Sequence, residues 1–171
     1  MGAGVLPVAL YKGALILLLG QERNNNLWCD FGGSPNKGEK PFKTAIREGS
    51  EELNGFLGDE NDFEITVTHN LILSITFDRY TSYIFKTNYD KKLPQYFTNV
   101  NNFAEFHLKD KIDTKHNGLF EKKQIQWFPL SKFKEDKSRA MFREHYKPLL
   151  DSVLKNEQFI IKFIETMEPN K

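Results

Sequence analysis

The run from Ala14 to Leu19 constrains the fold most strongly, because it contains no polar residue. A strand with one face in water alternates apolar and polar side chains, so this run predicts a strand that is buried on both faces. A second apolar run, Val5 to Leu10, precedes it, and only Tyr11-Lys12-Gly13 lies between them. Because glycine tolerates the positive φ of a tight turn, the two runs predict a β-hairpin.

The next part of the chain changes from a strand pattern to a helix pattern. Leu27 to Phe31 is typical of a short strand, which leads into Gly32-Gly33. From Lys40 to Leu53 the apolar residues recur at helical spacing, and Pro41 suits the first turn of a helix. Asn54-Gly55 then predicts the end of that helix.

The rest of the chain predicts further strands and a helical C-terminal segment. Asp90 to Asn117 is long and polar, and we interpret it as a functional insertion or a mobile loop. Ser138 to Met167 predicts helix, with an interruption near Pro148. Segments rich in β-branched and aromatic residues predict strands over Phe63 to Thr68, Leu71 to Phe77, Ser82 to Thr87 and Gln124 to Phe128. We expect these elements to form a single layered α/β domain over residues 1–171.

The composition is that of a water-soluble globular chain. Hydrophobic residues make up 39% and charged residues 27%, which excludes a disordered or collagen-like class. The net charge of +1 does not indicate bulk nucleic-acid binding, although a local basic patch stays open. The only cysteine, Cys29, cannot form an internal disulfide, so we expect a reducing compartment, the cytoplasm. No apolar run is long enough to span a bilayer and no secretory signal is visible, so we expect no membrane partner.

Three glutamates share one flank of the predicted helix. Glu48, Glu51 and Glu52 stand at positions i, i+3 and i+4, so their side chains are neighbours and repel one another. Carboxylates crowded into one helical turn suit Mg²⁺ or a similar hard cation, which would neutralise phosphates and activate a water molecule. The alternative is an ordinary solvated acidic face. Gly32-Gly33, just before the helix, lets the backbone approach a ligand closely.

The spacing around these glutamates resembles the Nudix box. In that motif, glycine is followed after five residues by glutamate, after seven more by Arg-Glu, and two residues later by Glu-Glu. At the corresponding positions this chain has Gly33, Glu39, Arg47-Glu48 and Glu51-Glu52. It departs from the motif at Gly49, where an aliphatic residue is usual, and at Asn54-Gly55, where the motif has glycine and then an aliphatic residue.

This resemblance implies a fold, a reaction and residue roles. The fold would be a Nudix-type α/β/α sandwich with a mixed β-sheet. The reaction would be hydrolysis of a diphosphate linkage in a nucleoside diphosphate derivative, with Mg²⁺ or Mn²⁺ as cofactor. Glu52 is assigned as the general base, Glu48 would be a ligand or a base, and Arg47, paired with Glu39, would orient the glutamates. The metal ligands would be the carbonyl of Gly33 and the carboxylates of Glu48, Glu51 and Glu52.

Four further residues are candidates on weaker grounds. Glu121 precedes the last predicted strand, where some family members place an extra acidic ligand or base, and a surface glutamate beside lysines is the alternative. Arg23 and Lys37 lie in predicted loops, where they would contact phosphate or remain solvated loop charges. Tyr80 is a candidate for stacking on a nucleotide base, although most aromatic residues in strands belong to the core.

Three functions fit these observations. A small-molecule pyrophosphatase acting on a nucleotide or its conjugate is favoured, because it needs only the box and a pocket. An RNA 5′-end hydrolase, for decapping or pyrophosphate removal, is the alternative and would need a basic track. Its candidate track, which could equally be a solvated face, comprises Lys132, Lys134, Lys137, Arg139, Arg143 and Lys147. A Nudix-like binding module without activity ranks last because the box glutamates are retained, DNA is not expected as a partner, and a homodimer stays open.

Overall fold

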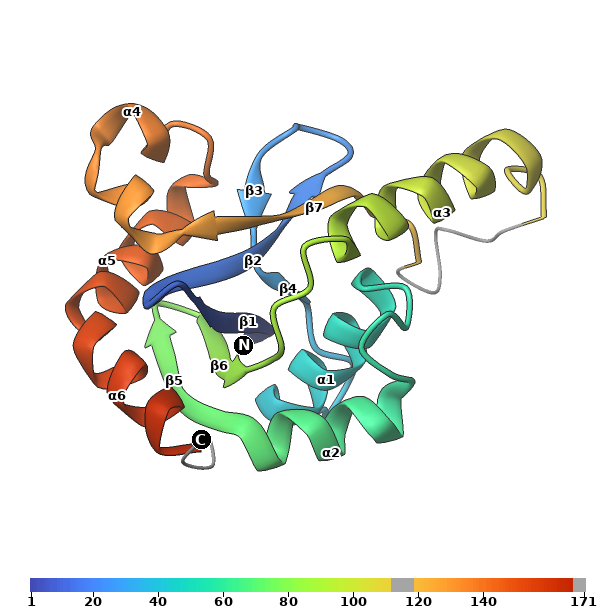
Figure 1. Ribbon diagram of the computed structural model, residues 1–171. Coiled ribbons are helices and arrows are strands. Elements are labelled where there is room, and N and C mark those ends of the chain that lie inside the picture. The colour runs from blue at the N-terminus through green and yellow to red at the C-terminus, as the bar shows by residue number, and fades with distance from the viewer. Residues whose placement is uncertain (112–118, 168–171) are drawn as a thin grey trace.

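A computed structural model describes residues 1–111 and 119–167 of the chain (Figure 1). The described strands form a seven-stranded sheet in the order β3-β2-β1-β6-β5, with β4 paired to β1 and β7 paired to β2. Only the β1–β6 pair is parallel, so the sheet is mixed. The strands are β1 (Gly2–Tyr11), β2 (Ala14–Glu22), β3 (Trp28–Cys29), β4 (Phe31–Gly33), β5 (Leu71–Phe77), β6 (Tyr80–Lys86) and β7 (Lys122–Pro129).

The predicted hairpin at the start of the chain is confirmed as β1 and β2. Tyr11 pairs with Ala14, which leaves a two-residue turn at Lys12 and Gly13 with φ angles of 52° and 77°. Two successive positive φ angles match the right-handed twist of the paired strands. The all-apolar strand β2 is buried on both faces as predicted, since neighbouring leucines along it belong to hydrophobic clusters on opposite sides of the sheet.

Helices cover both faces of the sheet (Figure 1). On one face the cluster is completed by side chains of α1, α2 and α3, and on the other by side chains of α5 and α6. The helices are α1 (Pro41–Glu52), α2 (Glu60–Asn70), α3 (Leu93–His107), α4 (Asp136–Arg139), α5 (Lys147–Lys155) and α6 (Glu157–Met167), with 3-10 turns η1 (Leu130–Lys134) and η2 (Glu144–Tyr146). The helix predicted from Lys40 to Leu53 is therefore confirmed as α1.

The strand predicted from Phe63 to Thr68 is wrong, because this segment lies within α2. The carboxylate of Asp59 accepts hydrogen bonds of 3.0 Å from the backbone N–H groups of Asn61 and Asp62 and so caps the helix. Phe63 and Val67 are fully buried one helical turn apart. Burial on one helix face outweighs the strand preference of the β-branched residues, which is weak and depends on context.

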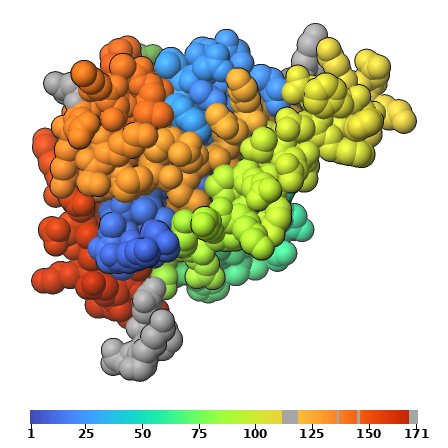
Figure 2. Space-filling view, turned by 45° about the horizontal axis from the view of Figure 1, so that its top comes forward, coloured from blue at the N-terminus to red at the C-terminus, as the bar shows by residue number. Residues whose placement is uncertain are grey.

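Of the two interpretations of Asp90 to Asn117, a functional insertion or a mobile loop, the loop is wrong over Leu93–His107, because this part forms the 15-residue helix α3. Pro94 lies in the first turn of the helix, where its missing N–H costs nothing. The buried residues of α3 recur at helical spacing: Leu93, Phe97, Asn101 and Ala104. In a space-filling view the far end of α3 stands out from the body of the molecule (Figure 2). Residues 112–117 of the predicted loop lie outside the described residues.

The C-terminal prediction is confirmed in outline. The helical segment is divided into α4, η2, α5 and α6, and Pro148 lies in the first turn of α5, so the chain is interrupted just before it. A second break follows at Asn156, which is the C-cap of α5. Across residues 1–111 and 119–167, no helix is both long enough and apolar enough to cross a membrane.

Candidate active site

The two departures from the Nudix box each have a packing role at α1. A Cβ atom at Gly49 would lie 2.6 Å from Cγ2 of Val5 and 2.9 Å from Cε1 of Phe63, so the missing side chain lets α1 pack closely on β1 and α2. Asn54 follows the helix with a φ of 51°, a left-handed conformation that asparagine tolerates better than most residues. Its amide group also donates to Oδ1 of Asn101 on α3 at 2.8 Å.

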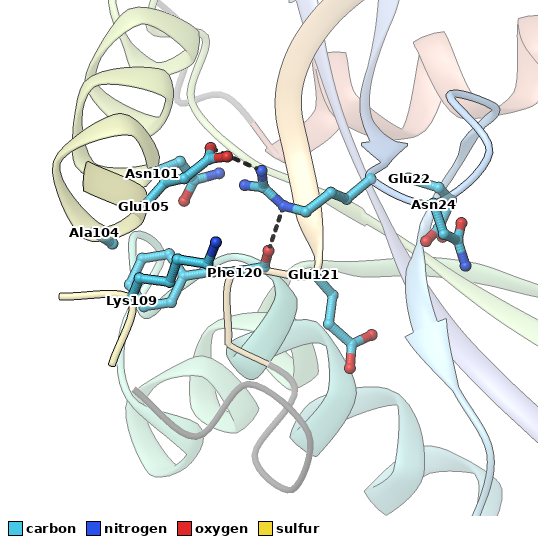
Figure 3. Close-up of a pocket in the computed structure, with 9 residues that line it drawn as sticks. Glu22, Asn24, Asn101, Ala104, Glu105, Lys109, Phe120 and Glu121 are labelled. Carbon is cyan, nitrogen blue, oxygen red and sulfur yellow. Dashed lines mark hydrogen bonds and ion pairs between the residues drawn. The ribbon is translucent and has the colours of Figure 1, made fainter. Parts of the chain in front are cut away.

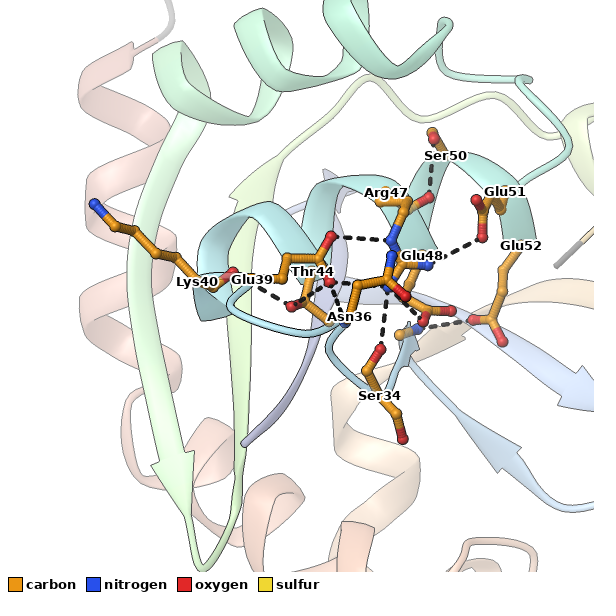
Figure 4. Close-up of polar contacts among 11 residues, drawn as sticks. Ser34, Asn36, Glu39, Lys40, Thr44, Arg47, Glu48, Ser50, Glu51 and Glu52 are labelled. Atoms are coloured by element: carbon orange, nitrogen blue, oxygen red, sulfur yellow. Dashed lines mark hydrogen bonds and ion pairs between the residues drawn. The ribbon is translucent and has the colours of Figure 1, made fainter. Parts of the chain in front are cut away.

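Arg47, in the middle of α1, is the centre of a polar cluster (Figure 4). Its Nε donates to Oε1 of Glu39 at 3.0 Å and its Nη2 donates to Oε2 of the same carboxylate at 3.0 Å. Nη2 also lies 3.0 Å from Oε1 of Glu48, and Nη1 lies 3.4 Å from Oε2 of Glu51. The guanidinium holds the pKa of Glu39 down, to about 2. The predicted pairing of Glu39 with Arg47 is confirmed, and it fixes the guanidinium between two of the box glutamates.

Glu48 lies directly against the backbone of Gly33. A Cβ atom at Gly33 would be 2.6 Å from the Cδ atom of Glu48, so any other residue here would displace the end of this side chain. The sequence suggested that glycine here lets a ligand approach, and in the structure the group that approaches is a side chain of α1. This contact places the Glu48 carboxylate beside the backbone of β4.

Glu48, Glu51 and Glu121 form a set of partly accessible acids, which we call the outer carboxylates. The side chains of Glu48 and Glu51 are 16% and 26% exposed, and Glu121 is exposed. Partial burial raises the pKa of Glu51, and the charges of Glu48 and Glu121 raise it further against the opposing effect of Arg47. The pKa of Glu121 is raised by burial and by the charge of Glu48. The charge of Glu48 thus raises the pKa values of both other acids, which is the electrostatic repulsion expected of neighbouring carboxylates.

Glu52, by contrast, is buried and points into the protein. Its Oε1 lies 3.0 Å from Nζ of Lys122, and its Oε2 accepts a 2.7 Å hydrogen bond from the N–H of Gly32. Burial raises the pKa of Glu52 to about 8, against the attraction of Lys122. The role of metal ligand and general base predicted for Glu52 stays a prediction, but its carboxylate already has a cation and a donor.

Lys122 is the centre of a buried charge network that also contains Glu22, Cys29 and Glu52. The side chain of Lys122 has no exposed surface. Its Nζ donates to Oε1 of Glu22 at 2.5 Å and to Sγ of Cys29 at 3.3 Å, while the Cys29 thiol donates to Glu22 at 3.1 Å. Arg143 reaches the rim of the network, 3.6 Å from Glu22. Burial raises the pKa of the Cys29 thiol, which keeps it neutral.

A cavity of about 500 Å³ has Glu121, one of the outer carboxylates, in its wall (Figure 3). Arg23 lines it and donates to the carbonyl of Phe120 at 3.2 Å and to Glu105 of α3 at 3.0 Å. The walls come from the loop after β2, from α3 and from the residues before β7: Glu22, Arg23, Asn24, Asn101, Ala104, Glu105, Lys109, Phe120 and Glu121. Glu121 therefore belongs both to this cavity and to the outer carboxylates.

The structure places the two remaining predicted residues outside this cavity. Lys37 is exposed in the loop before α1. Tyr80 packs over Gly4 and Gly32, and its hydroxyl donates to Oδ1 of Asp30 at 2.9 Å. Burial raises the pKa of Asp30 to about 6, against the hydrogen bonds that it accepts. Tyr80 thus packs, partly buried, against the hydrophobic cluster, and the stacking role predicted for it stays a prediction.

Three residues that sequence reasoning missed connect the site to the rest of the fold. Lys122 and Glu22 stand at the ends of strand patterns, where charged residues are ordinarily exposed. Asn101 is 1% exposed, and its amide donates to the carbonyl of Lys122 at 2.7 Å. None of them belongs to a local motif, because the contacts of Lys122 with Glu22 and with Asn101 join residues more than 20 positions apart in the chain.

The site residues fit a divalent cation in part. Within the described residues, no three Asp, Glu, His or Cys side chains lie close enough together to hold a metal ion as a group. The donor chemistry of the outer carboxylates nevertheless suits a hard cation, because carboxylate oxygens are the ligands that such ions prefer, the Glu48 carboxylate lies beside the backbone of Gly33, and its charge raises the pKa values of Glu51 and Glu121. Glu52 does not fit in this arrangement, since Lys122 is already bound to it.

The same architecture occurs in solved structures of other proteins. No family model and no curated protein matches the sequence. A C. elegans Ap4A hydrolase in a binary complex is similar with a TM-score of 0.52 and 17% identity, over 91% of this chain and 96% of that one. The NUDIX domain of Shewanella oneidensis NrtR, complexed with ADP ribose, is similar with a TM-score of 0.50 and 13% identity, over 91% and 86% of the two chains. This chain has the Nudix fold, and the predicted sandwich with a mixed sheet is confirmed.

Proposed function

We propose that the chain is a divalent-metal-dependent hydrolase that cleaves the diphosphate linkage of a small nucleotide-type molecule. The observation that carries this proposal is the position of Glu121, which joins the outer carboxylates to a cavity of about 500 Å³. A volume of this size suits a small-molecule ligand. The two similar structures support the substrate class, since one is an Ap4A hydrolase and the other was solved with ADP ribose.

The outer carboxylates would hold the cation. A bound Mg²⁺ or Mn²⁺ would supply charge neutralisation at the phosphates and a lowered pKa for an attacking water. Arg47 keeps Glu48 and Glu51 oriented, because Glu39 fixes its guanidinium from the other side. Glu121, with its raised pKa, is the accessible residue best suited to accept a proton from water.

The cavity walls offer groups for the rest of the substrate. Arg23 and Lys109 are the cations that line it, and arginine binds phosphate oxygens in pairs. Arg23 is held by Glu105 through an ion pair in which both side chains are partly exposed, so a phosphate group can compete for the guanidinium. Phe120 offers an aromatic side chain in the same wall, which can stack on a nucleotide base.

The alternative of an RNA 5′-end hydrolase has less support. Four of the six residues of the predicted basic track are ion-paired: Lys134, Arg139, Arg143 and Lys147. Lys132 lies 5.1 Å from the ring centroid of Phe128, in a cation–π contact. Because these cations already have partners, we expect them to bind the phosphate backbone of an RNA chain more weakly than a groove of unpaired cations would.

The test is hydrolysis of a substrate panel with Mg²⁺ or Mn²⁺. The panel contains nucleoside triphosphates, dinucleoside polyphosphates, nucleotide sugars, ADP-ribose, NADH and capped RNA. We expect cleavage of a small nucleotide conjugate that chelation abolishes and added metal restores. Cleavage of capped RNA alone, with a rate that falls steeply as salt rises, would instead establish the RNA 5′-end hydrolase. The absence of metal-dependent cleavage of any member would contradict the proposal.

A further inference from the structure

The buried position of Lys122 is created by an irregularity in β7. Gln21 pairs with Gln124, but the next residue of β2, Glu22, pairs with Lys122, so Lys123 is an extra residue in β7. Alternation along a strand would turn Lys123 to the face of the sheet that carries α1. The bulge turns Lys122 to that face instead, and Lys123 remains exposed. A β-bulge is a common way to redirect a side chain next to an active site.

The protein also makes room for the long stem of this lysine. A Cβ atom at Gly20 on the neighbouring strand would lie 2.9 Å from Cδ and 3.0 Å from Cγ of Lys122, so glycine leaves the space that the stem fills. From the other side, the side-chain amide of Asn101 on α3 donates a hydrogen bond to the backbone carbonyl of Lys122. The lysine is therefore fixed from the strand side and from the helix side.

The ammonium group of Lys122 occupies the position beside the Glu52 carboxylate that a metal ion would need in order to bind it. Nζ is 3.0 Å from Oε1 of Glu52 and 2.5 Å from Oε1 of Glu22, so one cation serves two buried acids. A buried carboxylate without a neighbouring cation is strongly unfavourable. Lys122 therefore supplies the compensating positive charge that a divalent ion would otherwise supply. The outer carboxylates have only Arg47 and no buried cation of their own among the described contacts.

We propose that Lys122 is a built-in cation at Glu52, which reserves divalent-metal binding for the outer carboxylates. This inference rests on the proposed function, because it assumes that the outer carboxylates hold a metal. It has a specific consequence: of the two adjacent glutamates in the box, Glu51 is a metal ligand and Glu52 is a structural partner of Lys122.

Calorimetric titration of Mn²⁺ into the full chain tests this distinction without any substrate. Glu51→Gln and Glu52→Gln are matched variants, because they make the same change at adjacent positions of α1. We expect the wild type to bind a single Mn²⁺, and Glu51→Gln to weaken it by more than about tenfold. Glu52→Gln should keep the stoichiometry and change the affinity by less than about tenfold, since its amide oxygen can still accept from Gly32.

Lys122→Met provides the converse test. If Lys122 occupies the place of a cation, its removal should open a second Mn²⁺ site at Glu22 and Glu52, seen as an increase in stoichiometry. A folded Lys122→Met chain that gains no ion would overturn the proposal. If this variant does not fold, the two glutamine variants decide, and an equal loss of Mn²⁺ from both overturns it. A wild type that binds no Mn²⁺ overturns this inference together with the proposed function, whereas loss at Glu52→Gln overturns the inference alone.

Discussion

Helix α1 contacts two cation–carboxylate groups that differ in almost every physical respect. At Arg47 the guanidinium is 19% exposed, and its partners Glu39, Glu48 and Glu51 lie in or just before the same helix. At Lys122 the ammonium is fully buried, and its partners come from α1 and β2. The first group is built by local spacing and stays open to a ligand. The second is formed by long-range contacts between β7, β2 and α1 and is not accessible to a ligand.

This difference indicates a division of labour within one short motif. Partly exposed acids can exchange a protein partner for a metal ion or a phosphate at small cost, because exposed ion pairs contribute only about 0–1 kcal/mol. Buried acids cannot, because removal of one partner leaves an uncompensated charge. Chemistry is therefore expected at the Arg47 side of the helix, and stability at the Lys122 side.

Removal of the buried cation should have the largest effect on stability. Lys122→Met leaves Glu22 and Glu52 buried without their ammonium partner, which is expected to lower the free energy of unfolding by about 3–5 kcal/mol. Chemical denaturation at neutral pH measures this loss. Lys123→Met is the matched control at the exposed neighbouring position and should stay within about 0.5 kcal/mol of wild type. Equal effects of the two substitutions would show that the network does not stabilise the fold.

The next effect is expected at Gly49, which lies on the face of α1 toward the core. Gly49→Ala places a methyl group 2.6 Å from Val5 and 2.9 Å from Phe63, so strain should outweigh the better helix propensity of alanine. We expect a loss of about 1–3 kcal/mol in the free energy of unfolding, measured by the same denaturation. A stabilised variant would mean that α1 and α2 can separate more easily than their packing indicates.

Arg47→Lys tests whether the partly exposed guanidinium positions the box glutamates. Lysine keeps the positive charge but cannot bond Glu39 through two nitrogen atoms while also reaching Glu48 and Glu51. On the substrate identified from the panel, we expect kcat to fall by about 10–100-fold, as for other residues that orient metal ligands. The melting temperature should change little. Unchanged kcat would remove the positioning role of the guanidinium.

The smallest effect concerns acid stability. The pKa of Glu39 is lowered to about 2 by Arg47, so its contribution is fully present above its ordinary value near 4.5 and is lost as pH falls toward 2. Wild type should therefore lose stability over this window relative to Glu39→Gln, by roughly 0–1 kcal/mol because the pair is near the surface. Denaturation at a series of pH values measures the difference, and parallel curves for the two proteins would contradict it.

The sequence predicted the pairing of Glu39 with Arg47, but it did not predict the buried contacts of Lys122 with Glu22 and Glu52. Glu39, Arg47 and the box glutamates follow from spacing within about four helical turns of chain, where most contacts are set by the period of the helix. Lys122 and Glu22 meet across 100 residues, and the bulge that brings them together has no local signature. The sequence therefore predicted that Glu52 is a metal ligand together with Glu48 and Glu51, whereas long-range contacts give Glu52 surroundings that differ from those of the other two.

The same reasoning explains the errors in the fold. The strand predicted at Phe63 to Thr68 relied on side-chain propensity. The helix cap at Asp59 and the close packing of Phe63 against Gly49 of α1 outweigh that propensity. In the segment of α3, Pro94 suggested a loop, yet it occupies the first turn of a helix. The predicted β1–β2 hairpin held because its turn and both of its strands are encoded within a few neighbouring residues.

The most direct test of the account is the hydrolysis rate of Glu51→Gln on the substrate that the wild type cleaves. Glu51 is half-buried, has a 3.4 Å contact with Arg47 as its one ion pair among the described residues, and belongs to the carboxylates that we propose hold the metal. The account predicts a fall in kcat of at least about 100-fold at saturating Mg²⁺, with an unchanged melting temperature. A variant that cleaves the substrate as fast as the wild type would contradict the assignment of the chemistry to the outer carboxylates.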